Sequence, residues 1–329
     1  MTSPRAISVV IPTYRRAAVV RRALMALANQ TLALDQYEVI VSIDGPDDET
    51  SRTIARLEVP YHLIVCSQPH KGRAAACNAG ISLATGDLVV LLDDDMEPDP
   101  GFLAAHQHAH PDDSQLGIVG AVPITVEKSS PPVVKYIGDK FNRHLAKLAQ
   151  SGQHFGLRDF YSGNFSIRRE TLLRVNAFDE AFKVYGNEDL DLSVRLRMAG
   201  VHLRFCAEAS ARQYYTKDFA ALARDNIAKG NTALLLATKH PQTFQDLKLA
   251  TYQQGSRLWR LLRSVLLGLS RLWAGTPASV VVFITWLEKH QPAHLSLFYR
   301  LALDYFFWLG VKSSLRDNNR EVDPVCRHF

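Results

Sequence analysis

The chain has 329 residues, of which 47% are hydrophobic and 22% are charged, and its formal net charge is +5 at pH 7. This composition is that of a globular protein with a full hydrophobic core, and it argues against intrinsic disorder. The positive excess is small and forms no basic run of the kind found in nucleic-acid-binding modules, so we expect no nucleic-acid partner.

Short apolar runs alternate with helical segments over the first hundred residues. The runs are residues 7–12, 38–44, 63–66 and 88–92. Each run is nearly continuous and rich in β-branched residues, which predicts strands buried on both faces of a parallel sheet. Helices are predicted between them, at residues 19–30 and 50–57. This alternation predicts βαβ units with right-handed connections.

The regular alternation ends near residue 115. Further strands are predicted at residues 117–124, 160–168 and 201–206, and further helices at residues 133–150 and 188–199. From about residue 219 helical spacing dominates. We therefore expect two domains, an α/β catalytic domain at residues 1–215 and a helical C-terminal extension at residues 216–329.

Acidic side chains follow two of the predicted strands, at the edge where ligands bind in open parallel sheets. Asp44 ends the second strand, and Asp93, Asp94 and Asp95 follow the fourth. Three adjacent carboxylates repel one another unless a cation or hydrogen-bond donors neutralise them. Because Mg²⁺ and Mn²⁺ commonly join one or two carboxylates to substrate phosphates, the run predicts a divalent metal site. An acidic turn that caps a helix near Asp99 is the alternative.

Five segments in this order and spacing resemble the family 2 glycosyltransferases. They are residues 9–14 (VVIPTY), Asp44, residues 72–80, the aspartates at 93–95 and residues 185–189 (YGNED). The resemblance covers about residues 6–210. It implies a GT-A fold, which is a Rossmann-like, mixed, mostly parallel sheet flanked by helices. It also implies metal-dependent transfer of a sugar from a nucleotide donor with inversion at the anomeric carbon.

The resemblance places the nucleotide base at the ends of the first two strands. It implies that Pro12, Thr13, Tyr14 and Arg15 line the base pocket and that Asp44 accepts a hydrogen bond from the base. A carboxylate can accept from the N3–H of uracil, whereas cytosine has no donor there, so UDP is the expected nucleotide. The nucleotide dTDP stays open because thymine shares the group. Asp44 is also a common turn residue, which is the structural alternative.

The remaining donor and acceptor contacts are implied for two glycine-containing segments. Gly72, Arg73 and Asn78 are expected to approach the diphosphate and ribose, because glycine lets the backbone come close and arginine pairs with phosphate. Gly163 and Asn164 belong to the segment expected beside the donor sugar and the acceptor. A simple loop before a strand is the alternative for that second segment.

Two clusters of acidic residues are expected to carry out the chemistry, one after the fourth strand and one at the start of the helix predicted at residues 188–199. By resemblance, Asp93 and Asp94 contact the donor, while Asp95 and Asp93 ligate a Mn²⁺ or Mg²⁺ cofactor. The acceptor hydroxyl must lose its proton as it attacks, and a positioned carboxylate is the natural base. Asp189 is the expected base and Glu188 the alternative. A purely structural role as helix caps is the other reading of both residues.

Three positions depart from the family pattern. Arg15 stands where asparagine is most frequent, and Cys77 stands where an arginine commonly precedes Asn78. Gln213 lies near the place where many relatives carry a histidine that ligates the metal. We expect Arg73 to substitute for the missing arginine. Metal affinity could then be lower, or other groups could hold the diphosphate.

Histidines and cysteines give no second metal site. His106, His108 and His110 have i, i+2, i+4 spacing, which does not direct all three to one side of a helix, so we expect them at the surface. The cysteines lie far apart without a CxxC pair, at Cys66, Cys77, Cys206 and Cys326. Together with the lack of a signal peptide or a spanning segment, this favours a cytoplasmic location, extending to the inner face of the cell membrane.

The C-terminal region contains a basic amphipathic helix at residues 256–273, with leucines at i, i+3, i+4 spacing and arginines mostly off that stripe. Aromatic residues gather at 299–308. These helices either pack on the catalytic domain or lie in a bilayer interface, as a peripheral membrane contact. The second reading would make the acceptor a lipid-linked saccharide.

The expected function is transfer from a nucleotide-sugar donor to a hydroxyl of a glycan or a lipid-linked saccharide. A sugar-1-phosphate nucleotidyltransferase is one alternative, since it shares the α/β plan and the metal. That class resembles chains with a glycine-rich basic loop after the first strand, and residues 12–15 lack the glycines. A non-catalytic sugar- or lipid-binding scaffold of the same fold is the other alternative.

Overall fold

The computed structural model describes residues 6–111, 115–150, 155–290 and 292–317. They form two compact units. The first holds the described residues up to Thr125, then Gly138–Lys183 and Glu188–Tyr215, and the second holds Val126–Ile137, Val184–Asn187 and the described residues from Thr216 on. A single boundary near residue 215 therefore does not describe the second unit, which also takes two short earlier segments.

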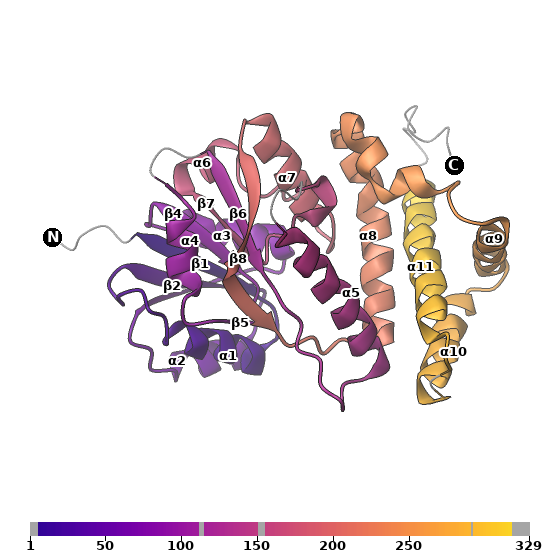
Figure 1. Cartoon of the computed structure of the whole chain (residues 1–329), viewed down its shortest axis with the longest axis horizontal. Helices are drawn as coiled ribbons and strands as arrows, with labels where there is room; N and C mark the ends of the chain where they lie inside the picture. The colour runs from indigo at the N-terminus through magenta and orange to yellow at the C-terminus, as the bar shows by residue number, and fades with distance from the viewer. Residues whose placement is uncertain (1–5, 112–114, 151–154, 291, 318–329) are drawn as a thin grey trace. The chain divides into compact units, whose positions relative to one another are not determined.

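The first unit is built on an eight-stranded sheet with the order β3-β2-β1-β4-β7-β6-β8-β5 (Figure 1). The strands are β1 Ile7–Thr13, β2 Tyr37–Asp44, β3 His62–Gln68, β4 Leu88–Leu92, β5 Met96–Pro98, β6 Leu116–Ala121, β7 Asn164–Arg168 and β8 His202–Gln213. The first four are parallel, and β6 is parallel to β8. In contrast, β7 is antiparallel to β4 and β6, and β5 is antiparallel to β8. The predicted mixed, mostly parallel sheet is confirmed.

Helices flank this sheet. They are α1 Ala17–Leu27, α2 Asp48–Ala55, α3 Arg73–Leu83, α4 Phe102–His108, α6 Arg169–Arg174 and α7 Glu188–Met198, while α5 Pro132–Leu148 begins in the second unit and continues into the first. Successive residues of a strand point to opposite faces, so Val9 packs in one buried cluster with Leu24 of α1, and Val10 packs in another with Ile81 of α3. Two covered faces explain why β1 and β4 read as continuous apolar runs.

Several predicted strands have different limits in the structure, and two of these differences bear on the candidate site. The segment predicted from residue 160 becomes a strand only at Asn164, because Ser162 and Gly163 form a turn that contacts the acidic run. The strand predicted at 201–206 continues to Gln213, where it pairs with β5. Both differences lie at the rim of the sheet that carries the candidate site.

A buried polar chain fixes β7 against α4, and it corrects the expectation that the histidines lie at the surface. His106 is fully buried and His110 nearly so, whereas His108 is exposed. The Asn164 amide donates to the carbonyl oxygens of Ala121 and Ala209, so its oxygen must accept from His106 Nε2–H at 2.8 Å.

The direction of the remaining bonds follows from that first one. His106 Nδ1 then accepts from the Ser166 hydroxyl at 2.7 Å, and Ser166 Oγ accepts from His110 Nε2–H at 2.8 Å. Burial lowers the pKa of His106 to about 3. Burial and the nearby Arg168 lower the pKa of His110 to about 4. Both imidazoles are therefore neutral at pH 7.

We expect the protein to lose stability between pH 7 and pH 5, because the unfolded chain binds protons at these histidines near pH 6.5 and the folded chain does not. The stabilisation is complete above pH 6.5 and is lost as the pH falls toward the folded-state values. Each histidine should lower the free energy of unfolding by about 1–2 kcal/mol over that range. Urea unfolding at both pH values measures this.

His108→Asn is the matched control and should leave the difference between pH 7 and pH 5 unchanged, because His108 is exposed. His106→Asn should shrink that difference, whatever its effect on stability at pH 7. An equal pH dependence in the wild type and in His106→Asn would contradict the assignment.

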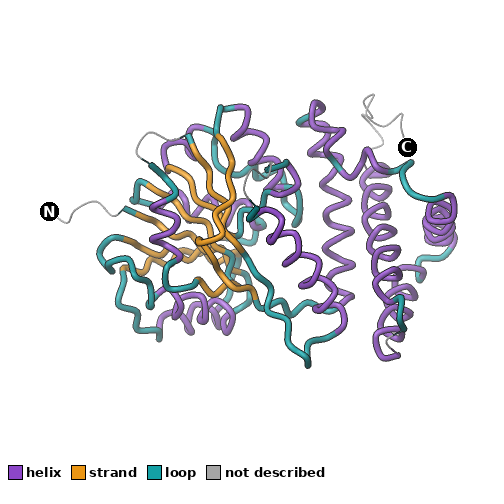
Figure 2. The backbone as a smooth tube through the Cα atoms, viewed as in Figure 1, coloured by secondary structure: helices purple, strands orange, loops and turns teal. Residues whose placement is uncertain are grey.

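The second unit is helical (Figure 2). Its helices are α8 Phe219–Lys239, α9 Arg257–Leu272, α10 Thr276–His290 and α11 Leu295–Asp317. Glycines allow α8 and α11 to approach closely: a Cβ atom at Gly230 would lie 2.1 Å from the Phe307 carbonyl oxygen, and one at Gly310 would lie 2.1 Å from that of Ile227. Among the described helices, none has the length and apolarity needed to cross a membrane.

Candidate active site

The acidic run after β4 is neutralised mainly by hydrogen-bond donors from β1 and the start of α1. Thr13 Oγ1 donates to Asp94 Oδ2 at 2.7 Å, and Arg16 Nη1 donates to Asp94 Oδ1 at 2.6 Å. The other guanidinium nitrogen of Arg16 donates to Asp95 Oδ2 at 3.2 Å, and Gln213 Nε2 donates to Asp95 Oδ1 at 3.2 Å. Sequence reasoning gave no role to Arg16, although it lies in the polar segment that follows β1.

Asp94 is the buried member of the run, with a side chain 5% exposed. Burial, together with the charges of Asp95 and Asp93, raises the pKa of Asp94 to about 7, although Arg16 and Thr13 oppose the shift. Both Asp94 oxygens are engaged by the protein, so this side chain positions Thr13 and Arg16. The contact with the sugar donor that the resemblance implies for Asp94 stays a prediction.

Arg73, the first residue of α3, joins the two acidic motifs. Its Nη2 lies 2.7 Å from Asp93 Oδ1, and its Nη1 lies 3.0 Å from Ser162 Oγ and 3.1 Å from Asp189 Oδ1. The Glu188 carboxylate is 3.8 Å from the same Nη1. The chain thus brings together residues that are up to 116 positions apart. Five carboxylates share the guanidinium groups of Arg16 and Arg73.

Asp189 and Glu188 differ in their access to solvent. Both lie in the first turn of α7, where exposed N–H groups favour negative charge. The Asp189 side chain is 28% exposed and that of Glu188 is 3% exposed. Asp189 Oδ1 also accepts from the Ser162 hydroxyl. Of the two candidate bases, Asp189 is the more accessible to solvent.

Asp44 organises the loop between β3 and α3. Its Oδ1 accepts from Gln68 Nε2 and from the Lys71 N–H, both at 2.9 Å. Its Oδ2 accepts from the Gly72 N–H at 2.9 Å and lies 2.8 Å from His70 Nδ1. Three N–H donors, from Gln68, Lys71 and Gly72, therefore hold this carboxylate in place. These hydrogen bonds lower the pKa of Asp44, although burial opposes them.

An exposed aromatic pair stands beside Asp44. Tyr14 stacks on His70 with ring centroids 4.4 Å apart, and the Arg15 guanidinium lies 5.2 Å from the Tyr14 ring. Arg15 has a φ of +52°, which is uncommon for a residue other than glycine. Pro12, at the end of β1, is partly buried. The pair offers a flat, exposed surface at the end of β1 and β2, and sequence reasoning missed His70.

Two glycines are required by close contacts. Gly72 has a φ of +96°, and a Cβ atom there would lie 2.6 Å from the Lys183 carbonyl oxygen. At Gly163 a Cβ atom would lie 2.3 Å from Asp93 Oδ2. Gly72 therefore lets the backbone pass beside Lys183, and Gly163 lets it pass beside Asp93 of the acidic run. The Gly163 carbonyl also accepts from the Asp93 N–H at 2.8 Å.

Two predicted contact residues are instead engaged within the protein. Asn78 donates to the Phe178 carbonyl oxygen and accepts from the Phe178 N–H, both at 2.9 Å, and it donates to Glu180 at 3.0 Å. The Asn164 side chain is fully buried in the histidine chain described above. Asn164 therefore cannot offer its side chain to an acceptor, because β7 points it into the interior.

The charge and the oxygen atoms of this rim fit a divalent cation. The side chains of Asp93 and Asp95 are 33% and 11% exposed, and Gln213 places an amide beside Asp95. Among the described residues, no three His, Cys, Asp or Glu side chains form a metal cage of their own. Mg²⁺ is usually held by one or two carboxylates plus substrate phosphates, and Asp93 and Asp95 satisfy that requirement.

The chain is similar in sequence to known glycosyltransferases. The sequence profile of the family described as Glycosyltransferase like family 2 matches residues 4–232. A validoxylamine A glucosyltransferase from Streptomyces hygroscopicus subsp. jinggangensis is 33% identical over 227 residues, which cover 62% of this chain and 54% of that protein. The chain thus matches about half the length of this relative.

Solved structures share the fold over nearly the whole chain. A mannosyltransferase from Pyrobaculum calidifontis, solved with GDP-Man and Mn²⁺, has a TM-score of 0.62 at 17% identity and covers 96% of this chain and 90% of its own. Residues 1–349 of S. aureus TarS, solved with UDP, have a TM-score of 0.52 at 13% identity and cover 97% and 94%. These likenesses confirm the GT-A fold.

Proposed function

Because the chain belongs to the family Glycosyltransferase like family 2, we propose that it transfers a sugar from a UDP-sugar to a hydroxyl of a glycan or lipid-linked saccharide, with inversion at the anomeric carbon. The observation that carries this proposal is the single guanidinium of Arg73 between Asp93 and Asp189. It puts the donor-side acidic run and the candidate base within one hydrogen-bonded cluster. A sugar held over Arg73 would have its anomeric carbon next to both.

The transfer is a single displacement. The acceptor oxygen forms a bond to the anomeric carbon while the bond from that carbon to the phosphate oxygen breaks, and the acceptor proton passes to the Asp189 carboxylate. UDP leaves with the electron pair of the broken bond. The Arg73 guanidinium can pair with the phosphate oxygens as their negative charge grows, which supports the leaving group.

The base pocket is proposed at the Tyr14–His70 pair. A uracil ring can stack on the exposed face of Tyr14, which is 38% exposed. Asp44 can accept from the uracil N3–H when His70, whose side chain is 56% exposed, gives up its place at Oδ2. The backbone donors Lys71 and Gly72 keep the carboxylate in position during that exchange.

A metal cofactor is proposed at the acidic run. Asp95 and Asp93 would hold Mn²⁺ or Mg²⁺, and the bound ion would supply a Lewis acid that neutralises the diphosphate. Arg16 and Gln213 also donate hydrogen bonds to Asp95. Gln213 places its amide near the position where many relatives are expected to carry a histidine that ligates the metal.

Release of nucleoside diphosphate tests the proposal. The protein is incubated with UDP-, dTDP- and GDP-sugars, with Mn²⁺ or with EDTA, and slow hydrolysis of the donor is followed without any acceptor. We expect UDP to be released, and the release to stop with EDTA. Binding without turnover would favour the scaffold, and pyrophosphate formed from UTP and a sugar 1-phosphate would favour the nucleotidyltransferase. Turnover of GDP-sugars alone would contradict the assignment of UDP, but not a contact between Asp44 and the base, because guanine N1–H can also donate to a carboxylate.

A further inference from the structure

Helix α9 of the second unit turns its apolar face outward. The exposed side chains recur at i, i+3, i+4 and i+7 and so form one stripe along the helix. They are Leu258, Leu261, Leu262, Val265, Leu269 and Leu272, with exposed fractions from 40% to 86%. Trp273, which follows the helix, is 61% exposed. Neighbouring α10 adds the exposed side chains Val282, Phe283 and Trp286.

The opposite face of α9 attaches the helix to α11 through polar contacts. Arg263 is buried and donates to Asp304 at 3.2 Å, and Trp259 Nε1 donates to the same carboxylate at 3.2 Å. Ser270 and Tyr305 share a hydrogen bond of 2.7 Å. A surface helix normally buries its apolar stripe, so this orientation is inverted. These polar contacts hold α9 with its leucines toward solvent. Only a partner that covers the leucines would remove them from water.

The surroundings of the stripe carry positive charge. Basic residues between 256 and 317 are Arg257, Arg260, Arg263, Arg271, Lys289, Arg300, Lys312 and Arg316, against the acidic Glu288, Asp304 and Asp317. Glu288 is engaged inside the unit by Tyr299, and Asp304 is engaged by Arg263 and Lys248. By helical spacing, Arg257 borders the stripe, whereas Arg260 and Arg271 lie toward the opposite face of the helix.

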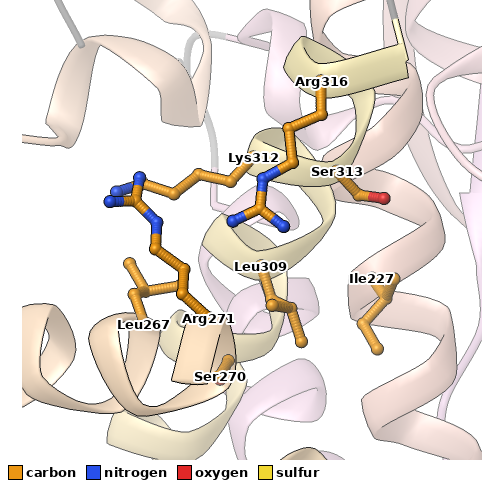
Figure 3. Close-up of a pocket in the computed structure, with 8 residues that line it drawn as sticks. All are labelled: Ile227, Leu267, Ser270, Arg271, Leu309, Lys312, Ser313 and Arg316. Carbon is orange, nitrogen blue, oxygen red and sulfur yellow. The ribbon is translucent and has the colours of Figure 1, made fainter. Parts of the chain in front are cut away.

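A basic pocket lies between α9 and α11. It has a volume of about 230 Å³, and Ile227, Leu267 and Leu309 provide its apolar lining. Arg271 of α9 and Lys312 and Arg316 of α11 also line the pocket, and in the view of Figure 3 the ends of Arg271 and Lys312 meet while that of Arg316 lies apart from them. No carboxylate among the described side chains forms an ion pair with these three cations. A phosphate group would supply the missing negative charge.

We propose that α9 lies in the surface of an anionic phospholipid bilayer. The leucine stripe would enter the boundary between headgroups and acyl chains, Trp273 would lie at headgroup level, and Arg271, Lys312 and Arg316 would bind a lipid phosphate. A second copy of this chain would bring the same positive charge to the interface, whereas an anionic bilayer brings the opposite charge. The acceptor would then be presented at the same surface.

Vesicle sedimentation tests this with the full chain. We expect binding to vesicles of phosphatidylglycerol and phosphatidylcholine, little binding to pure phosphatidylcholine, and a loss of binding as salt rises. Replacing Leu258, Leu261 and Leu269 by serine should weaken binding at least tenfold. Because these positions are exposed, the melting temperature should not fall. Replacing Leu34, Leu83 and Leu173 by serine is the matched control, with three leucines 40–42% exposed outside α9.

The second set of variants addresses the phosphate. Changing Arg271, Lys312 and Arg316 to glutamine should remove most of the preference for anionic vesicles. Equal sedimentation of the leucine variant and its control would overturn the proposal. So would stabilisation by inorganic phosphate without vesicle binding, or a dimer in light scattering that the leucine variant dissociates. Donor hydrolysis measured without vesicles should be equal in all variants, so failure here is distinguishable from failure of the glycosyltransferase proposal.

Discussion

Arg73→Ala is expected to abolish detectable transfer and to lower the free energy of unfolding by about 3–5 kcal/mol. The alanine leaves Asp93, Asp189 and the buried Glu188 without the cation that they share. Like charges in a poorly solvated cluster then repel one another. UDP release at saturating donor measures the first effect, and urea unfolding at pH 7.5 measures the second.

Arg73→Lys separates charge from geometry. Lysine keeps one positive charge but lacks the planar fork that reaches Asp93 on one side and Asp189 with Ser162 on the other. We expect it to recover most of the stability and little of the activity. Arg56→Ala, at an exposed arginine after α2, is the control and should change neither quantity. Full activity in Arg73→Ala would show that the guanidinium does not organise the site.

The sheet was predictable from sequence because its central strands are covered on both faces. A strand such as β4 has five buried residues, LVVLL, and its limits coincide with the end of the apolar run. The acidic motifs at the rim follow from the same limits, since what comes after a parallel strand lies at the binding edge. The spacing of apolar residues was sufficient to predict those elements whose position depends on burial alone.

The contacts within the site were not predictable in the same way. Arg16 reaches Asp94 across 78 positions of the chain, and Ser162 reaches Asp189 across 27. No periodicity records such a pairing, because each partner alone looks like a surface residue. The prediction that the histidines lie at the surface was wrong for a related reason. Helical spacing correctly separates His108 from the other two, but it cannot show that Ser166 and Asn164 will satisfy a buried imidazole.

The amphipathic pattern of α9 was also predictable, but not the direction of its apolar face. The stripe is a property of local spacing, whereas its outward orientation depends on Arg263, which finds Asp304 and the rings of Tyr252 and Trp308 in the interior of the unit. A sequence pattern defines an apolar face and a polar face of a helix, but tertiary contacts decide which of the two is buried.

Asp189→Asn should reduce the turnover number by about 10³-fold or more while UDP binding changes little, because the amide keeps a hydrogen-bond acceptor for Ser162 but cannot take a proton from the acceptor. The loss should appear in kcat rather than in the affinity for the donor, since Asp189 meets the acceptor side of the reaction. Steady-state transfer and UDP titration by calorimetry measure the two quantities.

Glu188→Gln decides between the two carboxylates of α7. Its side chain is 3% exposed, so an acceptor hydroxyl cannot reach it, and we expect a smaller loss of turnover than in Asp189→Asn. Asp35→Asn removes one negative charge from an exposed loop and serves as the control. A larger loss in Glu188→Gln than in Asp189→Asn would move the base to Glu188. That outcome would also require the Glu188 carboxylate, which is buried in the free protein, to become accessible when the acceptor binds.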